Sequence, residues 1–208
     1  MKQYEKALSL GYDVITCSEY FDKKQDLCSR TIVNRVDVDY SVKKIERLLD
    51  LYEVLNIKAT FFIRLHADDY NPFSFENYRI IKKIRDCGHE IGYHSEVVDQ
   101  SVIWDELAQD CLVRDINVIN NMFDIKIRGI ASHGGFTGEN NLSFWIERSP
   151  SEFNLDYEAY ENSKSFDLFH RAFYVSDSSW TFWKCYKSGQ LVEGDKRSFG
   201  EHLDDLHP

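Results

Sequence analysis

Long uncharged hydrophobic runs are missing from this 208-residue sequence. The first 24 residues, MKQYEKALSLGYDVITCSEYFDKK, carry acidic or polar residues inside every apolar segment, so they lack the core of a signal peptide or a membrane span. We therefore expect a cytoplasmic protein with no transmembrane segment. Positive charge is also scarce, because 25 Lys and Arg stand against 35 Asp and Glu and leave a net charge of −10. Such a balance repels nucleic acid, and we expect no nucleic-acid partner.

Paired cysteines and prolines are few as well. The five cysteines include no CxxC pair, which argues against a disulfide framework and against a thiolate zinc site. Only three prolines interrupt the chain, and 43% hydrophobic with 29% charged residues is typical of a compact globular protein. At this length one domain is the default, so we expect residues 1–208 to form a single domain on which residues 1–30 pack as an amino-terminal extension.

Strand-like and helix-like segments alternate along the chain. Apolar residues at a 3.6-residue period predict helices, and short β-branched or aromatic runs predict strands. The predicted order is strand 31–38, helix 42–55, strand 57–64, helix 74–86, strand 89–94, helix 101–122 and strand 125–132. This order predicts an α/β fold in which parallel strands are joined by helical crossovers. The carboxyl ends of the strands then share one face, where such folds carry their chemistry.

Asp37 and Asp39 are the first candidates for function, because a spacing of two on a strand places both carboxylates on one side. The ends of the following strands present further polar residues, namely Arg64, His66, His94, Glu96 and His133. Carboxylates and imidazoles together suit zinc and other first-row divalent ions. One aspartate can bind the ion while the other accepts a proton from the water that the ion activates. The pattern therefore favours metal-assisted hydrolysis.

Several stretches in this order resemble the polysaccharide deacetylases, which are metal-dependent enzymes that remove acetyl groups from sugars. These stretches are RVDVDY, KATFF, GHEIGYHSE, RGIASHGG, YVSDSSW and LDDLHP, and they span about residues 31–208. The resemblance implies a distorted or incomplete parallel β/α barrel. A subgroup associated with surface-polysaccharide and O-antigen biosynthesis is the more similar one. It shares an H-x-E at residues 94–96, the His-Gly at 133–134 with Asn141 and Trp145, and the Ser-Asp at 176–177 before Trp180.

The resemblance implies a metal site built on the first and third strands. Asp37 matches the general base of the family, and Asp39 and His94 match two metal ligands. The position of the usual third ligand is Val98 here. The candidates to replace it are Glu96, Asp99 and His133, of which we favour His133 or Glu96.

Other residues match the family's remaining motifs. Arg128 matches the arginine that orients the base, and His207 matches the histidine that protonates the leaving amine. Tyr93, Asp177 and Trp180 are candidates for binding the substrate.

Together these patterns predict a metal-dependent hydrolase that removes an acetyl group from an acetylated carbohydrate in surface-polysaccharide biosynthesis. Zinc is the expected ion, with manganese, cobalt and nickel as alternatives. Two other readings stay open at this point. The chain can be an inactive, deacetylase-like carbohydrate-binding protein, or a glycosyltransferase that uses DVD as its metal-binding DxD motif.

Overall fold

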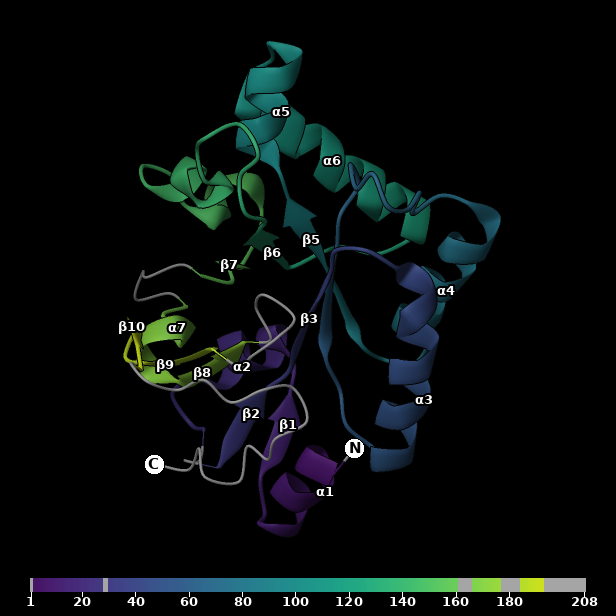
Figure 1. Ribbon diagram of the computed structural model, residues 1–208, viewed down its shortest axis with the longest axis vertical. Coiled ribbons are helices and arrows are strands. Elements are labelled where there is room, and N and C mark those ends of the chain that lie inside the picture. The colour runs from purple at the N-terminus through teal and green to yellow at the C-terminus, as the bar shows by residue number, and fades with distance from the viewer. Residues whose placement is uncertain (1, 28–29, 161–165, 177–183, 193–208) are drawn as a thin grey trace.

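A parallel β-sheet forms the centre of the computed structural model, which describes residues 2–27, 30–160, 166–176 and 184–192. The sheet has five strands in the order β3-β4-β5-β6-β7 (Figure 1). Their bounds are β3 Arg35–Val38, β4 Thr60–Ile63, β5 Glu90–Ser95, β6 Gly129–Ser132 and β7 Tyr157–Glu158. Within the described residues the sheet is open, with β3 and β7 at its edges. The predicted α/β fold with an incomplete parallel barrel is confirmed.

Helical segments form the crossovers between these strands. A 3-10 turn η1 and helix α3 join β3 to β4, helix α4 joins β4 to β5, and helices α5 and α6 join β5 to β6. Their bounds are η1 Val42–Lys44, α3 Ile45–Leu55, α4 Phe75–Asp86, α5 Val97–Trp104 and α6 Ala108–Phe123. The single helix predicted over 101–122 is in fact two, because Asp105 adopts a left-handed conformation (φ 55°) and ends α5.

The strand predicted over 31–38 is also divided. Strand β2 (Thr31–Val33) pairs in parallel with β1 (Asp13–Ile15) in a separate two-stranded sheet, and only β3 joins the central sheet. Asn34 makes the transition, since its N–H donates to the carbonyl of Ile15 while its own carbonyl accepts from the N–H of Thr60. Helices α1 (Lys2–Ser9) and α2 (Cys17–Lys23) complete the amino-terminal part.

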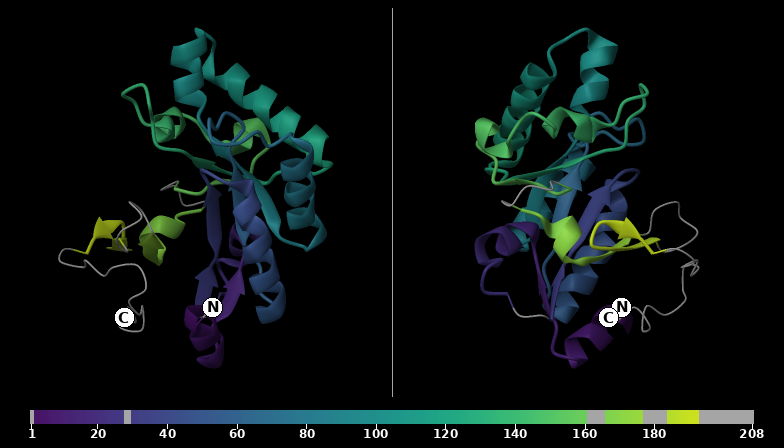
Figure 2. Two further views of the ribbon diagram at one scale, coloured as in Figure 1. Left: turned by 45° about the vertical axis from the view of Figure 1, so that its right-hand side comes forward. Right: turned by 90° about the vertical axis from the view of Figure 1, so that its left-hand side faces the viewer.

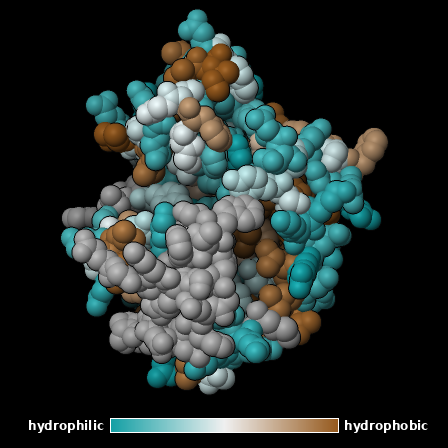
Figure 3. All heavy atoms as spheres, viewed as in Figure 1, coloured by the Kyte–Doolittle hydropathy of each residue, from teal (hydrophilic) through white to brown (hydrophobic). Residues whose placement is uncertain are grey.

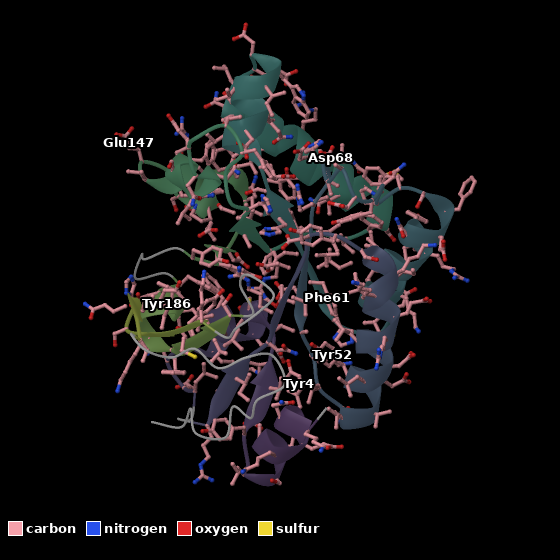
Figure 4. All side chains as sticks on the ribbon, in the orientation of Figure 1. Tyr4, Tyr52, Phe61, Asp68, Glu147 and Tyr186 are labelled. Atoms are coloured by element: carbon pink, nitrogen blue, oxygen red, sulfur yellow. The ribbon has the colours of Figure 1, made fainter. Side chains whose placement is uncertain are left out.

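Both faces of the central sheet are covered, which explains why all four residues of β4 are buried. Phe61 and Ile63 point into the larger core beneath α3, α4 and α6, whereas Phe62 points into a second core with Tyr157 and Phe166. In the larger core the rings of Tyr4, Tyr52 and Phe61 follow one another from α1 through α3 to β4 (Figure 4).

A second, antiparallel sheet follows the central one in the chain. After the 3-10 turns η2 (Asn141–Trp145) and η3 (Pro150–Phe153) come helix α7 and strands β8, β9 and β10. Their bounds are α7 Leu168–Arg171, β8 Phe173–Ser176, β9 Lys184–Lys187 and β10 Gln190–Leu191. This small sheet lies on the side of the central sheet away from α3 and α4 (Figures 1 and 2).

The described surface carries one apolar protrusion where α5 meets α6, seen as brown spheres at the top of Figure 3. Its exposed residues are Val102, Ile103, Trp104 and Leu107. None of the helices in the described part of the chain combines the length and the apolar character that a membrane crossing requires.

Candidate metal centre and active site

The inner face of the sheet is organised in rows of side chains. The register places Arg35, Thr60 and Glu90 in a first row and Asp37, Phe62 and Gly92 in the second. Gly92 is required in the second row because a Cβ there would lie 2.4 Å from Cε1 of Phe62. The fully buried rings of Phe62 and Tyr157 fill this level, and Gly129 gives Tyr157 its space in the same way.

A third row opens at the carboxyl ends of the strands. Asp39 follows β3, His94 lies near the end of β5 and His133 follows β6. The alternation of strand side chains brings Asp37 and Asp39 to the same side, as predicted. His94 Nε2 lies 3.3 Å from Asp39 Oδ1 and 3.8 Å from Asp37 Oδ2.

Asp39, His94 and His133 form a cluster whose ligand atoms all lie within 4.8 Å of one another. Asp39 Oδ1 is the shared corner, 3.3 Å from His94 Nε2 and 3.9 Å from His133 Nε2. The backbone N–H of His133 donates to the carbonyl of Ser95, which holds the third ligand beside β5. Two imidazoles and one carboxylate with further positions open match a catalytic zinc site.

The hydrogen bonds show that this cluster fits a cation. His94 Nδ1 lies 2.8 Å from the carbonyl oxygen of Ala131, which can only accept, so Nδ1 carries a proton and Nε2 of the neutral ring is the nitrogen that could bind an ion. Asp39 Oδ1 and His133 Nδ1 are buried without a hydrogen-bond partner among the described residues. Asp39 Oδ1 faces Nε2 of both histidines, and a cation held among these three atoms would give this oxygen the partner that it lacks.

Burial and neighbouring charges shift the pKa values of His94, His133 and Asp37. Burial lowers the pKa of His94, but the charge of Asp37 and the contacts with Asp39 outweigh it and raise that pKa above its ordinary value. Burial lowers the pKa of His133, and the neighbouring His94 and Arg64 lower it further. Burial raises the pKa of Asp37, yet Arg35, His94 and His133 bring it down to about 2. Asp37 is therefore ionised at neutral pH.

Glu96 lies behind the cluster rather than in it. Its Oε1 accepts from Arg64 Nη2 at 2.6 Å and lies 3.6 Å from His133 Nδ1, the ring nitrogen remote from Asp39. Arg64 also donates to the carbonyl of Asp39 at 3.2 Å. Glu96 thus lies beside His133 without a hydrogen bond to its ring, and Arg64 links Glu96 to the backbone of Asp39.

Asp99 has no oxygen left for an ion. Its Oδ1 accepts from the backbone N–H groups of Phe136 and Thr137 and from the Thr137 hydroxyl, and its Oδ2 accepts from Asn141 Nδ2 at 2.7 Å. Asn141 also donates to the carbonyl of His133 at 3.1 Å. These bonds fold the loop that carries His133, so among the three candidates for the third ligand the structure brings His133 to the cluster.

The arginine that contacts Asp37 is Arg35, not Arg128. Arg35 donates through Nε to Asp37 Oδ1 (2.9 Å) and through Nη2 to Asp37 Oδ2 (2.6 Å). Arg128 instead bonds Asp22 with both Nη atoms and Asp156 with Nε. The physical reason is its position at the amino end of β6, roughly 16 Å of strand before His133. The role expected for Arg128 is therefore corrected.

The remaining predicted residues have other surroundings. Tyr93 is fully buried in the larger core and donates its hydroxyl to Asp115 at 2.6 Å, on the opposite side of β5 from His94. His66 also bonds Asp115, at 3.0 Å. The candidates Asp177, Trp180 and His207 lie outside the described residues.

Two aromatic residues near the cluster carry no sequence motif. Phe136 is 65% exposed, and its ring centroid lies 5.1 Å from that of His133. Tyr160 packs its ring 4.1 Å from the guanidinium carbon of Arg35 and accepts a hydrogen bond from Arg35 Nη2. The spacing of two between Arg35 and Asp37 was a signal for Arg35, whereas Phe136 and Tyr160 lie in segments without a periodic pattern.

No protein-family model matches this sequence, and no curated protein matches it. Solved structures of deacetylases share its fold. The deacetylase PplD of Streptococcus pyogenes, solved in complex with acetate, is 13% identical with a TM-score of 0.51, over 73% of this chain and 66% of that one. The BpsB deacetylase domain of Bordetella bronchiseptica is 16% identical with a TM-score of 0.50, over 74% of each chain.

A CE4 family pseudoenzyme from Bacillus anthracis is 21% identical with a TM-score of 0.40. The match covers 60% of this chain and 41% of that one, so this chain spans less than half of its length. At these identities the likeness concerns the fold. The fold of this chain is therefore similar to that of the deacetylases PplD and BpsB.

Proposed function

We propose that this protein is a metal-dependent hydrolase that removes an acetyl group from an acetylated sugar. The observation that carries the proposal is the convergence of Asp39, His94 and His133 on one point, with the ionised Asp37 beside them. The deacetylase fold of PplD and BpsB supports the same reaction class. Two histidines and one carboxylate favour zinc, and manganese, cobalt or nickel suit the same donors.

The residues divide the work of hydrolysis among them. Asp39, His94 and His133 would hold the ion, which when bound polarises the acetyl carbonyl and makes water more acidic. Asp37 lies beside this position and is ionised, so it accepts the proton of the attacking water. Arg35 holds the plane of the Asp37 carboxylate during this transfer. His207, as the candidate acid, would return a proton to the leaving group.

The sugar enters this site from the carboxyl ends of the strands, where Phe136 is exposed beside His133. We propose that the acetylated sugar belongs to the assembly of a surface polysaccharide, on the strength of the His94-Ser95-Glu96 and His133-Gly134 motifs. Of these motifs, Asn141 donates a hydrogen bond to the carbonyl of His133, and Glu96 lies 3.6 Å from His133 Nδ1.

Elemental analysis of the purified chain and of His94→Ala tests the metal site, and acetate release from a panel of N- and O-acetylated oligosaccharides tests the reaction. We expect about one divalent ion per chain, lost in the variant, and acetate release that Asp37→Asn abolishes while the ion is retained. Absence of any ion after dialysis against zinc, manganese and cobalt would overturn the proposal. A bound ion with oligosaccharide binding but without acetate release would instead identify a carbohydrate-binding protein on the same fold.

A further inference from the structure

Two aspartates compete for one ion at this site. Asp37 Oδ2 and Asp39 Oδ1 lie 3.8 Å and 3.3 Å from the same His94 nitrogen. Asp37 belongs to β3 and Asp39 follows it directly, and both carboxylates point to one side. Asp39 Oδ1 also lies 3.9 Å from His133 Nε2, but Asp37 is close enough to His94 to compete for the same ion unless something holds it away.

The partners of the two carboxylates differ. Both oxygens of Asp37 accept from the guanidinium fork of Arg35, whereas Asp39 Oδ1 has no hydrogen-bond donor among the described residues. A bidentate fork fixes the plane of a carboxylate as well as its position. Asp37 cannot turn an oxygen toward the ion without breaking at least one of these two bonds.

Arg35 is itself held from two sides. The ring of Tyr160 lies 4.1 Å from its guanidinium carbon and the ring of Phe62 lies 5.5 Å from it. Arg35 Nη2 also donates to the Tyr160 hydroxyl. Only 13% of the Arg35 side chain is exposed. The guanidinium is therefore confined between two rings and cannot follow a rotation of Asp37.

We propose that Arg35, held by Tyr160, assigns the roles of the two aspartates: it keeps Asp37 out of the coordination shell, so that Asp39 binds the ion and Asp37 remains the base. This inference rests on the metal site of the proposed function. Arg35 is thus a positioning residue that lowers metal affinity in exchange for a free base.

The proposal predicts that the loss of Arg35 strengthens metal binding rather than weakening it. Replacing Arg35 with Met removes a positive charge near the ion and releases a carboxylate to bind it, so Arg35→Met should bind Zn²⁺ roughly tenfold more tightly or better, because ligand charge tunes cation affinity. An arginine that only supports the site from outside would act in the opposite direction, since loss of such partners weakens metal binding by about 10- to 100-fold.

The experiment is a titration of the metal-free full chain with Zn²⁺ in competition with a chelator, repeated with Co²⁺ by absorption spectroscopy. Arg35→Met is compared with Arg128→Met, the matched change at an arginine that contacts neither aspartate. Arg35→Lys and Tyr160→Phe are milder changes that loosen the fork but keep a positive charge, and circular dichroism checks the folding of each variant.

We expect tighter Zn²⁺ binding and an altered Co²⁺ spectrum in Arg35→Met, smaller gains in Arg35→Lys and Tyr160→Phe, and no change in Arg128→Met. Adding Asp37→Asn to Arg35→Met should remove the gain. Unchanged or weaker binding in all three fork variants would overturn the role of Arg35 while leaving the metal site intact. If neither the native chain nor any variant binds an ion, the proposed function falls and this inference falls with it.

Discussion

The two ends of the sheet interior both carry half-buried carboxylates, but their partners differ. At the amino ends of the strands, which we call the floor, Glu90 accepts three hydrogen bonds. The donors are the backbone N–H of Ser18 (2.9 Å), the Thr60 hydroxyl (2.6 Å) and the Tyr157 hydroxyl (2.7 Å). At the carboxyl ends of the strands, which we call the mouth, Asp39 Oδ1 faces His94 and His133 and accepts no hydrogen bond from the residues that the structure describes. Glu90 and His94 belong to the same strand, four residues apart.

This contrast shows how a structural carboxylate differs from a ligand. Neutral donors satisfy Glu90, so it fastens α2 and β7 to β5 without needing an ion. Asp39 Oδ1 has no such donor among the described residues, which fits the ion that we propose there. The two carboxylates therefore differ in how many hydrogen-bond donors their oxygens have, rather than in burial or residue type.

The largest effect on metal binding is expected when one of the proposed ligands at the mouth is removed. His94→Ala should weaken Zn²⁺ binding by at least roughly 100-fold, because loss of an indirect partner alone commonly costs 10- to 100-fold. The matched change at the other buried histidine, His89→Ala, should leave the affinity unchanged, since His89 packs against Tyr52 and Phe61. Chelator competition measures both. Equal affinities in His94→Ala and the native chain would remove the distinction between mouth and floor.

Glu158 is a buried carboxyl group that should make the stability of the fold depend on pH. Burial raises its pKa from about 4.5 to about 7, although the N–H groups of Ser132 and Tyr160 oppose the shift. Between these values the folded chain keeps a proton that the unfolded chain has released, so stability falls as the pH rises through about 7. The loss is of the order of 3 kcal/mol at most. Urea unfolding at pH 5 and pH 8 with chelator present should show it in the native chain.

The control for this pH effect is Glu158→Gln, which cannot ionise. The difference in unfolding free energy between pH 5 and pH 8 should shrink in this variant relative to the native chain. The same difference in both proteins would show that another group causes the pH dependence.

At the floor, Glu90→Gln should affect the fold and not the ion. The variant keeps one carbonyl oxygen but turns an acceptor into a donor that faces other donors, so we expect a loss of roughly 1–3 kcal/mol in unfolding free energy. Zn²⁺ affinity of the folded variant should equal that of the native chain. A loss of affinity without a loss of stability would contradict the division between floor and mouth.

The smallest effect is expected for Arg128→Ala. Its ion pairs with Asp22 and Asp156 are partly exposed, and such pairs contribute about 0–1 kcal/mol. Stability should fall within this range, and metal affinity and acetate release should not change. A large loss of activity without unfolding would restore to Arg128 the role that Arg35 has in the structure.

Much of the fold follows from the sequence, because strand and helix periods are clear where the core faces both sides of the sheet. The exceptions are local. The strand-like segment from Thr31 to Val38 is predicted as one strand. In the structure it is two strands in different sheets, and the backbone hydrogen bonds change from one sheet to the other at Asn34. The helix near residue 105 divides because Asp105 accepts a left-handed conformation, which its sequence neighbours do not reveal.

The site is predictable to the extent that strand alternation determines it. Asp37, Asp39 and His94 follow from a period of two and from strand ends on one face. The choice of His133 over Asp99 does not, because it depends on loop N–H groups that fill the lone pairs of Asp99. The role of Arg35 was missed because a motif match favoured Arg128, and only packing shows which guanidinium reaches Asp37.

The ring layer made possible by Gly92 and Gly129 has a consequence for the two ends of the interior. Phe62 and Tyr157 fill the interior between the Glu90 network and the His94 cluster with closely packed aromatic carbon. Close packing of this kind leaves little room for water or for movement of side chains between the two ends of the interior. Apart from Arg35, which reaches Asp37 from the row of Glu90, the side chains at the two ends of the interior are thus separated by packed rings, so a substitution at an exposed residue such as Phe136 should leave the hydrogen bonds of Glu90 intact.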